Sequence, residues 1–226
     1  NRSRGRNIAI KKAKNEIIAI TDAGCIPHKD WLKKLTKSFN SNSVDVVAGG
    51  YKMIANNNFE KAESVFLGVS TKDIDDDFMP SARSMAFTKT IWKKAGGFPE
   101  KLDNTAEDTM FNLQLINIGA KFIVVKDAIV DWQMPSTIYE FGLKIYGYAK
   151  GDAESGIWWH PVEKLKTHNI KILTIFARYL LAFAFLASGY YGILWGYVGI
   201  YMFWAFNKAG FWGIVLQISS DFACII

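Results

Sequence analysis

One stretch of the chain, residues 172–206, constrains the fold more than any other feature. It reads ILTIFARYLLAFAFLASGYYGILWGYVGIYMFWAF, and Arg178 is its only charged residue. Its 35 residues exceed the roughly 20 apolar residues that one membrane-spanning helix needs. Ser188 and Gly189 lie near its middle and favour a turn between two short antiparallel spans. The alternative is one tilted span followed by a helix at the membrane interface.

Lysines lie on both sides of this apolar stretch, in EKLKTHNIK before it and NKAG after it. Because basic residues are enriched on the cytoplasmic side of membranes, we expect both ends, and residues 1–150, to be cytoplasmic. The net charge of +6 indicates anionic headgroups or phosphate-bearing substrates as partners. The basic residues do not form one dense stripe, so we expect no nucleic-acid partner.

The rest of the chain alternates between two kinds of apolar pattern. Short apolar runs predict strands at 16–22, 44–54, 83–88 and 121–125, and helical spacing predicts helices between them. Strands alternating with helices indicate an α/β fold. The first run, EIIAITD, has consecutive apolar residues bounded by polar ones, which is typical of a strand covered on both faces in a parallel sheet.

Asp22 follows the first predicted strand, in the sequence TDAGC. In open α/β sheets, ligands bind beyond the carboxyl ends of strands. A carboxylate there can hold a divalent cation that neutralises a diphosphate, and the small residues Ala23 and Gly24 let a ligand approach the backbone. The alternative is that Asp22 caps the turn and Gly24 only forms it.

A second acidic pair, Glu107 and Asp108, opens the predicted helix 107–119. Acidic residues in a first helical turn are favoured by the helix dipole alone, which is the simpler explanation. A helix N-terminus can also hold the side chain of a general base in a fixed position. The preceding segment, GGFPEKLDNTA, has the glycines, proline and polar residues of a loop that shapes a substrate site.

Three segments carry a resemblance to a known family: GRNIAIKKAKNEIIAITDAGCIPHKDWL, SARSMAFTKTIWKKAGGFPE and AEDTMFNLQLINIGAKF. Together they resemble the family 2 inverting glycosyltransferases of GT-A fold, over roughly residues 1–130. The resemblance implies a Rossmann-like mixed sheet flanked by helices, here followed by C-terminal transmembrane helices. Such enzymes open with a strand and helix that bind the nucleotide base, and this chain starts after them. We therefore expect residues 1–150 to be a partial, N-terminally truncated catalytic domain, 151–171 a juxtamembrane linker, and 172–226 membrane helices.

The resemblance also implies roles for individual residues. Asp22 matches the first aspartate of a DxD-like motif, which holds the donor and a Mg or Mn ion, but Gly24 stands where that motif ends in a second aspartate. Asp108 matches the catalytic base of an acidic ED pair, with Glu107 beside it. The residues that match donor-binding segments are Arg6, Asn7, Asp22, Ala23, Gly24, Arg83, Ser84, Gly96 and Gly97.

These observations predict a membrane-anchored enzyme of polysaccharide biosynthesis. It would transfer a sugar, with inversion, from a nucleotide-diphosphate sugar to a glycan or polyprenyl-linked acceptor, with the lipid bilayer as a further partner. Two alternatives remain open. A nucleotidyltransferase shares the α/β scaffold but uses a nucleoside triphosphate, and a catalytically inactive, membrane-tethered scaffold would explain the missing second aspartate.

Overall fold

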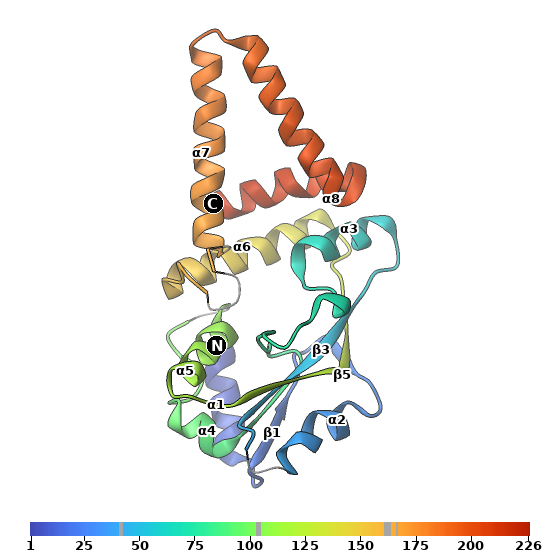
Figure 1. Cartoon of the computed structure of the whole chain (residues 1–226), viewed down its shortest axis with the longest axis vertical. Coiled ribbons are helices and arrows are strands. Elements are labelled where there is room, and N and C mark those ends of the chain that lie inside the picture. Colours follow the sequence, from blue (N-terminus) through green and yellow to red (C-terminus); the bar gives the residue numbers. More distant parts are fainter. Residues whose placement is uncertain (41–42, 103–104, 161–163, 166) are drawn as a thin grey trace. The chain divides into compact units, whose positions relative to one another are not determined.

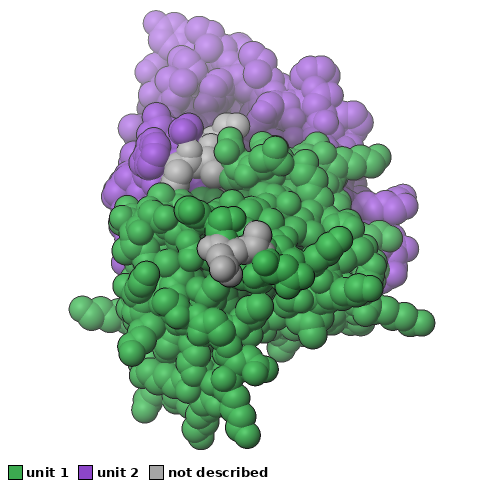
Figure 2. Space-filling view, turned by 60° about the horizontal axis from the view of Figure 1, so that its bottom comes forward, with its two compact units in different colours: residues 1–54, 69–133 green, residues 55–68, 134–226 purple. Residues whose placement is uncertain are grey.

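The computed structural model describes residues 1–40, 43–102, 105–160, 164–165 and 167–226. These form two compact units, one of Asn1–Ile54 with Val69–Gln133 and the other of Ala55–Gly68 with Met134–Ile226 (Figure 2). The boundary expected at residue 150 falls inside a helix of the second unit. Each unit is described by itself below.

The first unit is built on a mixed five-stranded sheet in the order β1-β4-β3-β5-β2. Its strands β3 and β5 are parallel, and the other neighbouring pairs are antiparallel. A mixed α/β sheet was expected. The first strand was also expected to be covered on both faces, and the structure differs there. That strand, β1, lies at the edge of the sheet described, and Ile18 is its one buried residue. The strands are β1 (Ile17–Ile20), β2 (Cys25–Pro27), β3 (Val46–Ile54), β4 (Met85–Thr88) and β5 (Phe122–Gln133).

Helices cover both faces of this sheet (Figure 1). Helix α2 lies on one face, where Trp31 and Leu35 are buried. The other face carries the main core, in which Phe87 of β4 meets Phe98 and Phe111. The helices of this unit are α1 (Arg2–Lys12), α2 (Trp31–Lys37), α4 (Lys89–Lys94) and α5 (Glu107–Asn117), with short 3-10 turns at Ser38–Asn40 and Thr71–Asp73.

Side chains of β4 point alternately to the two faces of the sheet, so this one strand contributes to the packing on both. Side chains of successive strand residues point to opposite sides of a sheet. Met85 and Phe87 therefore enter the main core, whereas Ser84, just before the strand, contacts Trp31 of α2.

The second unit is helical, and its α6 was expected to belong to the catalytic domain. One face of α6 is buried at Phe141, Ile145 and Ala149, and the ring of Phe141 lies 5.8 Å from that of Phe66 in α3. This apolar face packs on other helices of the same unit. The helices of this unit are α3 (Asn58–Leu67), α6 (Ile138–Ser155), α7 (His168–Ala187) and α8 (Tyr191–Ile225).

The apolar C-terminal stretch forms two helices joined by a tight turn at the predicted position. Helix α7 ends at Ala187, Ser188 caps it, and Gly189 has a φ of 73° that suits glycine. Helix α8 is interrupted at Ala209–Gly210, and its last part returns to α7 (Figure 1). Within the described ranges, α7 is the one helix long and apolar enough to cross a membrane, with 20 residues and a mean hydropathy of 1.9. Several C-terminal transmembrane helices were expected, and among the described residues only α7 meets these criteria.

Candidate functional site

Three segments that are distant in sequence meet at Arg6. Its Nη2 donates to Asp22 Oδ1 at 2.6 Å, and its Nη1 donates to Glu107 Oε1 at 2.8 Å. Arg6 lies on α1, Asp22 follows β1, and Glu107 begins α5. The two acidic features found in the sequence therefore belong to one site, with Arg6 between them.

The electrostatics of this bridge favour a permanently charged Arg6. Its side chain is 16% exposed, and that of Glu107 only 6%. Burial lowers the pKa of Arg6, but the hydrogen bond to Glu107 and the charge of Asp22 outweigh that effect and raise it. The planar guanidinium presents several donors in a fixed geometry, so it can hold two carboxylates at once.

Asp108 is held by backbone groups on two sides. Its Oδ2 accepts a hydrogen bond from the Ala82 N–H at 3.2 Å, and its Oδ1 accepts one from the Thr109 N–H at 2.9 Å. One turn later, buried Asn112 donates to the Pro80 carbonyl at 2.6 Å. The start of α5 therefore fixes the segment before β4 against Asp108, whose side chain remains partly exposed.

The loop that leads to this acidic pair is described only in part. Residues 103–104 lie outside the described residues. Ala106, immediately before α5, has a left-handed φ of 62°. A non-glycine residue in that conformation is uncommon and costs free energy, and such residues cluster at functional sites.

The segment Asp22–Gly24 forms a turn that is open to solvent. The Cys25 N–H donates to the Asp22 carbonyl at 3.1 Å, and Gly24 has a φ of 87°. Ala23 and Gly24 are exposed, and a Cβ on Gly24 would meet no neighbouring atom. The turn therefore leaves the backbone accessible, as the sequence predicts.

A metal ion at Asp22 would share this carboxylate with the Arg6 guanidinium, which bonds its Oδ1. Among the described residues, no group of three or more His, Cys, Asp or Glu side chains is placed to hold a metal. Magnesium is commonly bound through one or two carboxylates together with substrate phosphates. The donor set thus fits a cation that arrives with a diphosphate, and does not fit a permanently bound ion.

Arg83 belongs to an aromatic platform beside this site. Its guanidinium lies 3.8 Å from the centroid of the Trp132 ring and 5.3 Å from that of Tyr51. The two rings are themselves in edge-to-face contact at 5.7 Å. Trp132 lies beyond the strand predicted at 121–125, because β5 extends through Gln133. Tyr51 lies within the strand predicted at 44–54, but its contact with Arg83 depends on the tertiary structure.

Asn7 and Gly97 support the site from the core. The Asn7 Oδ1 accepts from Phe98 N at 2.9 Å and Trp92 Nε1 at 3.2 Å, and its Nδ2 donates to Phe98 O and Glu100 Oε1. Gly97 has a φ of 82°, and a Cβ there would lie 3.0 Å from the Asn7 oxygen. The Asn7 amide is buried and already bonded at both ends, so we assign it to holding this turn rather than to contact with a ligand. Gly96 in the same turn is exposed.

Ser84 also lies inside the protein. Its hydroxyl accepts from Trp31 Nε1 at 2.9 Å and donates to the Ala128 carbonyl at 3.1 Å, and its side chain is fully buried. A Cβ on Gly49 would collide with this hydroxyl. We therefore assign Ser84 to the packing of α2 on the sheet instead of to donor contact. Glu107 likewise faces Arg6 rather than open solvent.

A sequence match identifies the family that the N-terminal part of the chain, residues 1–95, resembles. A family model described as glycosyl transferase family 2 matches residues 1–95, which include Arg6, Asp22 and Arg83. Residues 1–95 are thus similar to glycosyl transferase family 2. The resemblance expected from the sequence is thereby confirmed, and Glu107 and Asp108 follow the matched family 2 segment. No curated protein matches the chain.

Solved structures resemble this chain at low sequence identity. The mannosyltransferase PcManGT from Pyrobaculum calidifontis, solved with GDP-Man and Mn²⁺, is 19% identical, with a TM-score of 0.54 over 97% of this chain and 66% of its own. TarS 1–349 from S. aureus is 20% identical, with a TM-score of 0.44 over 66% of this chain and 45% of its own. The same protein with UDP-GlcNAc is 16% identical, with a TM-score of 0.46 and coverages of 66% and 46%. The chain thus spans about half to two thirds of the length of these structures. The similarity to PcManGT supports the fold and no more.

Proposed function

We propose that this chain is part of an inverting glycosyltransferase that takes its sugar from a nucleotide-diphosphate donor. Support comes from the family 2 match over residues 1–95 and from the site geometry. The single observation that carries the proposal is the bridge from Arg6 to Asp22 and Glu107. This bridge joins Asp22, the carboxylate proposed for donor binding, to the start of α5, where the proposed base Asp108 lies.

The proposed base is Asp108. An inverting transfer requires a group that removes the proton from the acceptor hydroxyl as its oxygen attacks the anomeric carbon. Asp108 is partly exposed, and the N–H groups of Ala82 and Thr109 fix its carboxylate. These two contacts hold the carboxylate in a fixed position at the start of α5.

The departing nucleoside diphosphate requires positive charge nearby. Arg6 and Arg83 are the two arginines of the proposed donor site, Arg6 at the carboxylates and Arg83 on the ring of Trp132. A Mg or Mn ion, when bound, would add charge stabilisation of the diphosphate, and Asp22 is the residue that would hold it. The Mn²⁺ in PcManGT is consistent with this assignment.

For the acceptor, we propose a glycan or a polyprenyl-linked carrier at a lipid bilayer. The apolar helix α7 supports this, since only 6% of its most apolar window is buried within the protein. Large apolar side chains along it are more than half exposed, among them Phe176, Leu180 and Phe183. Exposure of so much apolar surface to water is unfavourable, so we propose that α7 and the first part of α8 lie in the membrane. We propose that the catalytic residues lie on the cytoplasmic side.

The test is a donor screen on the full-length protein. Sugar nucleotides with diphosphate linkages should raise its melting temperature and release nucleoside diphosphate when an acceptor is present. NMR of the product should show an inverted anomeric configuration. Consumption of nucleoside triphosphates in preference to diphosphate sugars would instead identify a nucleotidyltransferase. Absence of binding and turnover across the screen would favour an inactive scaffold.

A further inference from the structure

A charged cluster joins α7 to the last part of α8. Arg178 on α7 forms an ion pair with Asp221 on α8, 43 residues further along the chain. Asp221 is 1% exposed, although the surrounding helices are predominantly apolar. Ionisable residues in such a setting are costly unless they are paired, and they commonly mark functional sites.

The Asp221 carboxylate is fully engaged by its neighbours. Its Oδ2 accepts from Arg178, from the Tyr201 hydroxyl at 2.8 Å and from the Tyr179 hydroxyl at 3.4 Å. Its Oδ1 accepts from Gln217 Nε2 at 2.8 Å. This single carboxylate is therefore satisfied, and it balances one positive charge.

The cluster contains more than one positive charge. Lys208 donates to Gln217 Oε1 at 2.6 Å and lies 3.7 Å from the centroid of the Trp204 ring. Lys171 lies on α7 two turns before Arg178, and both act electrostatically on Lys208. Across the described ranges, neither Lys171 nor Lys208 forms an ion pair with a carboxylate. Three cations thus share one carboxylate, which leaves an excess positive charge beside an apolar surface.

Two further acidic residues of this unit, among those that the structure describes, do not add a negative charge to the cluster. Asp152 accepts from both the backbone N–H and the ring of His168 at the start of α7. Glu63 on α3 is fully buried, and burial, together with the charges of Glu60 and Glu140, raises its pKa to about 8. Glu63 is therefore predominantly protonated and uncharged at neutral pH. The aromatic rings stabilise cations, but they do not neutralise them.

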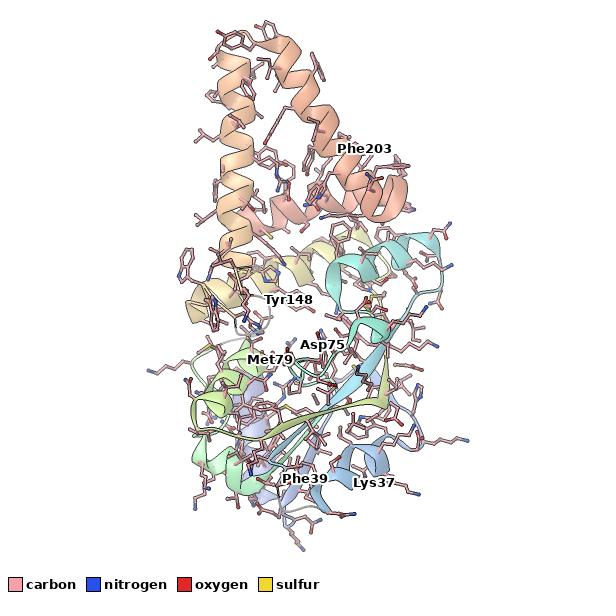
Figure 3. All side chains as sticks on the ribbon, in the orientation of Figure 1. Lys37, Phe39, Asp75, Met79, Tyr148 and Phe203 are labelled. Atoms are coloured by element: carbon pink, nitrogen blue, oxygen red, sulfur yellow. The ribbon has the colours of Figure 1, made fainter. Side chains whose placement is uncertain are left out.

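We propose that Lys171, Arg178 and Lys208 bind the phosphate group of an anionic membrane lipid. Lys171 is exposed and Lys208 partly exposed, so a phosphate can reach both from outside the helices. The exposed apolar side chains that continue along α7 and α8 would contact the acyl chains. They include Phe176, Leu180 and Phe183 on α7. On α8 they include Phe203, which is labelled in Figure 3. Basic pockets between membrane helices are known to bind lipid headgroups in this way. The inference rests on the proposed membrane placement of α7, and it is independent of the proposed catalytic site.

The test is lipid-dependent thermal stability of the full chain in dodecylmaltoside micelles. Phosphatidylglycerol, phosphatidylcholine and inorganic phosphate are each added to the wild type and to a Lys171→Gln/Lys208→Gln double variant. A ligand present at a hundredfold excess over its dissociation constant should raise the melting temperature by roughly 5–10 °C. We expect that rise with phosphatidylglycerol in the wild type, and its loss in the double variant.

A matched control is Lys33→Gln/Lys37→Gln, which removes the same charge from exposed positions of α2 and should keep the full response. A Lys171→Arg/Lys208→Arg variant should also keep it, which separates loss of charge from misfolding. An equal rise with phosphatidylcholine, or an equal loss in the α2 control, would overturn the proposal. An equal rise with inorganic phosphate alone would overturn the lipid assignment in favour of a soluble phosphate. Failure of the donor screen, with the phosphatidylglycerol response intact, would remove the proposed function and leave this site standing.

Discussion

The Arg6 guanidinium lies 2.6 Å from the Asp22 carboxylate and occupies the place of its counter-ion. This contact has two consequences. It stabilises a partly buried carboxylate without a ligand, and it makes any cation that binds at Asp22 compete with a side chain of the protein. Arg6 therefore links the stability of the fold to the binding of the proposed donor.

The first prediction concerns stability. Arg6→Gln removes the partner of two carboxylates, and Glu107 would be left nearly buried with an unpaired charge. We expect a loss of about 1–3 kcal/mol in the free energy of unfolding, measured by thermal or urea denaturation. Arg4→Gln, on the exposed side of α1, is the control and should change stability by less than about 0.5 kcal/mol. Equal losses in the two variants would show that the bridge is not the cause.

The second prediction concerns the divalent cation. Asp22→Asn should weaken donor binding by about tenfold or more, equivalent to about 1.4 kcal/mol, and should abolish any effect of Mn²⁺ on that binding. Calorimetric titration of the donor found in the screen, with Mn²⁺ and with EDTA, measures both effects. Asp127→Asn, which changes an exposed carboxylate in an ion pair with Lys34, is the control. Equal affinity of the wild type in EDTA would show that arginines alone neutralise the diphosphate.

The third prediction concerns the base. Asp108→Asn preserves the shape of the side chain and removes the proton acceptor, so transfer should fall by roughly 10²–10⁴-fold while donor affinity stays nearly constant. Single-turnover transfer and donor titration measure the two quantities separately. Transfer at the wild-type rate would rule out Asp108 as the base and, with it, the mechanism proposed above.

The fourth prediction concerns pH and Glu63. Burial and the charges of Glu60 and Glu140 raise the pKa of this carboxyl to about 8, and neither oxygen has a hydrogen-bond partner among the described residues. A raised carboxyl pKa means that the folded state binds more protons than the unfolded state between about pH 4.5 and 8. Stability should therefore decrease as pH rises through that window, by up to a few kcal/mol.

Glu63→Gln should flatten this dependence and raise the melting temperature at pH 8 above that of the wild type. Melting curves from pH 5 to 8.5 measure the effect, with Glu154→Gln, an exposed position of α6, as the control. A slope unchanged by Glu63→Gln would assign the pH dependence to other groups.

The fifth prediction concerns the membrane. A cysteine introduced at Lys150, near the C-terminal end of α6, should react with an impermeant maleimide only from the cytoplasmic side of sealed vesicles. The background requires Cys25→Ser and Cys224→Ser, since neither native cysteine forms a disulfide with another described residue. Labelling from the opposite side would overturn the cytoplasmic assignment of the catalytic residues.

The sequence by itself determined the local features of this protein. Apolar periodicity placed β1, β3, β4 and the first part of β5, but not β2. Gly189 marked the turn before α8, because only glycine adopts its φ of 73° at low cost. Two acidic features, Asp22 and the Glu107–Asp108 pair, were recognisable because each is a short motif at the end of a predicted element. The resemblance to family 2 depended on the same local motifs.

Only the tertiary structure decided which residues meet. Periodicity shows which face of an element is buried, but not the element that buries it. The sequence therefore could not pair Arg178 with Asp221, place Arg83 on Trp132, or separate α6 from the sheet. It also could not show that the Asn7 and Ser84 side chains are already fully bonded in the core. These contacts join residues far apart along the chain, so they follow from strand order and helix packing rather than from local composition.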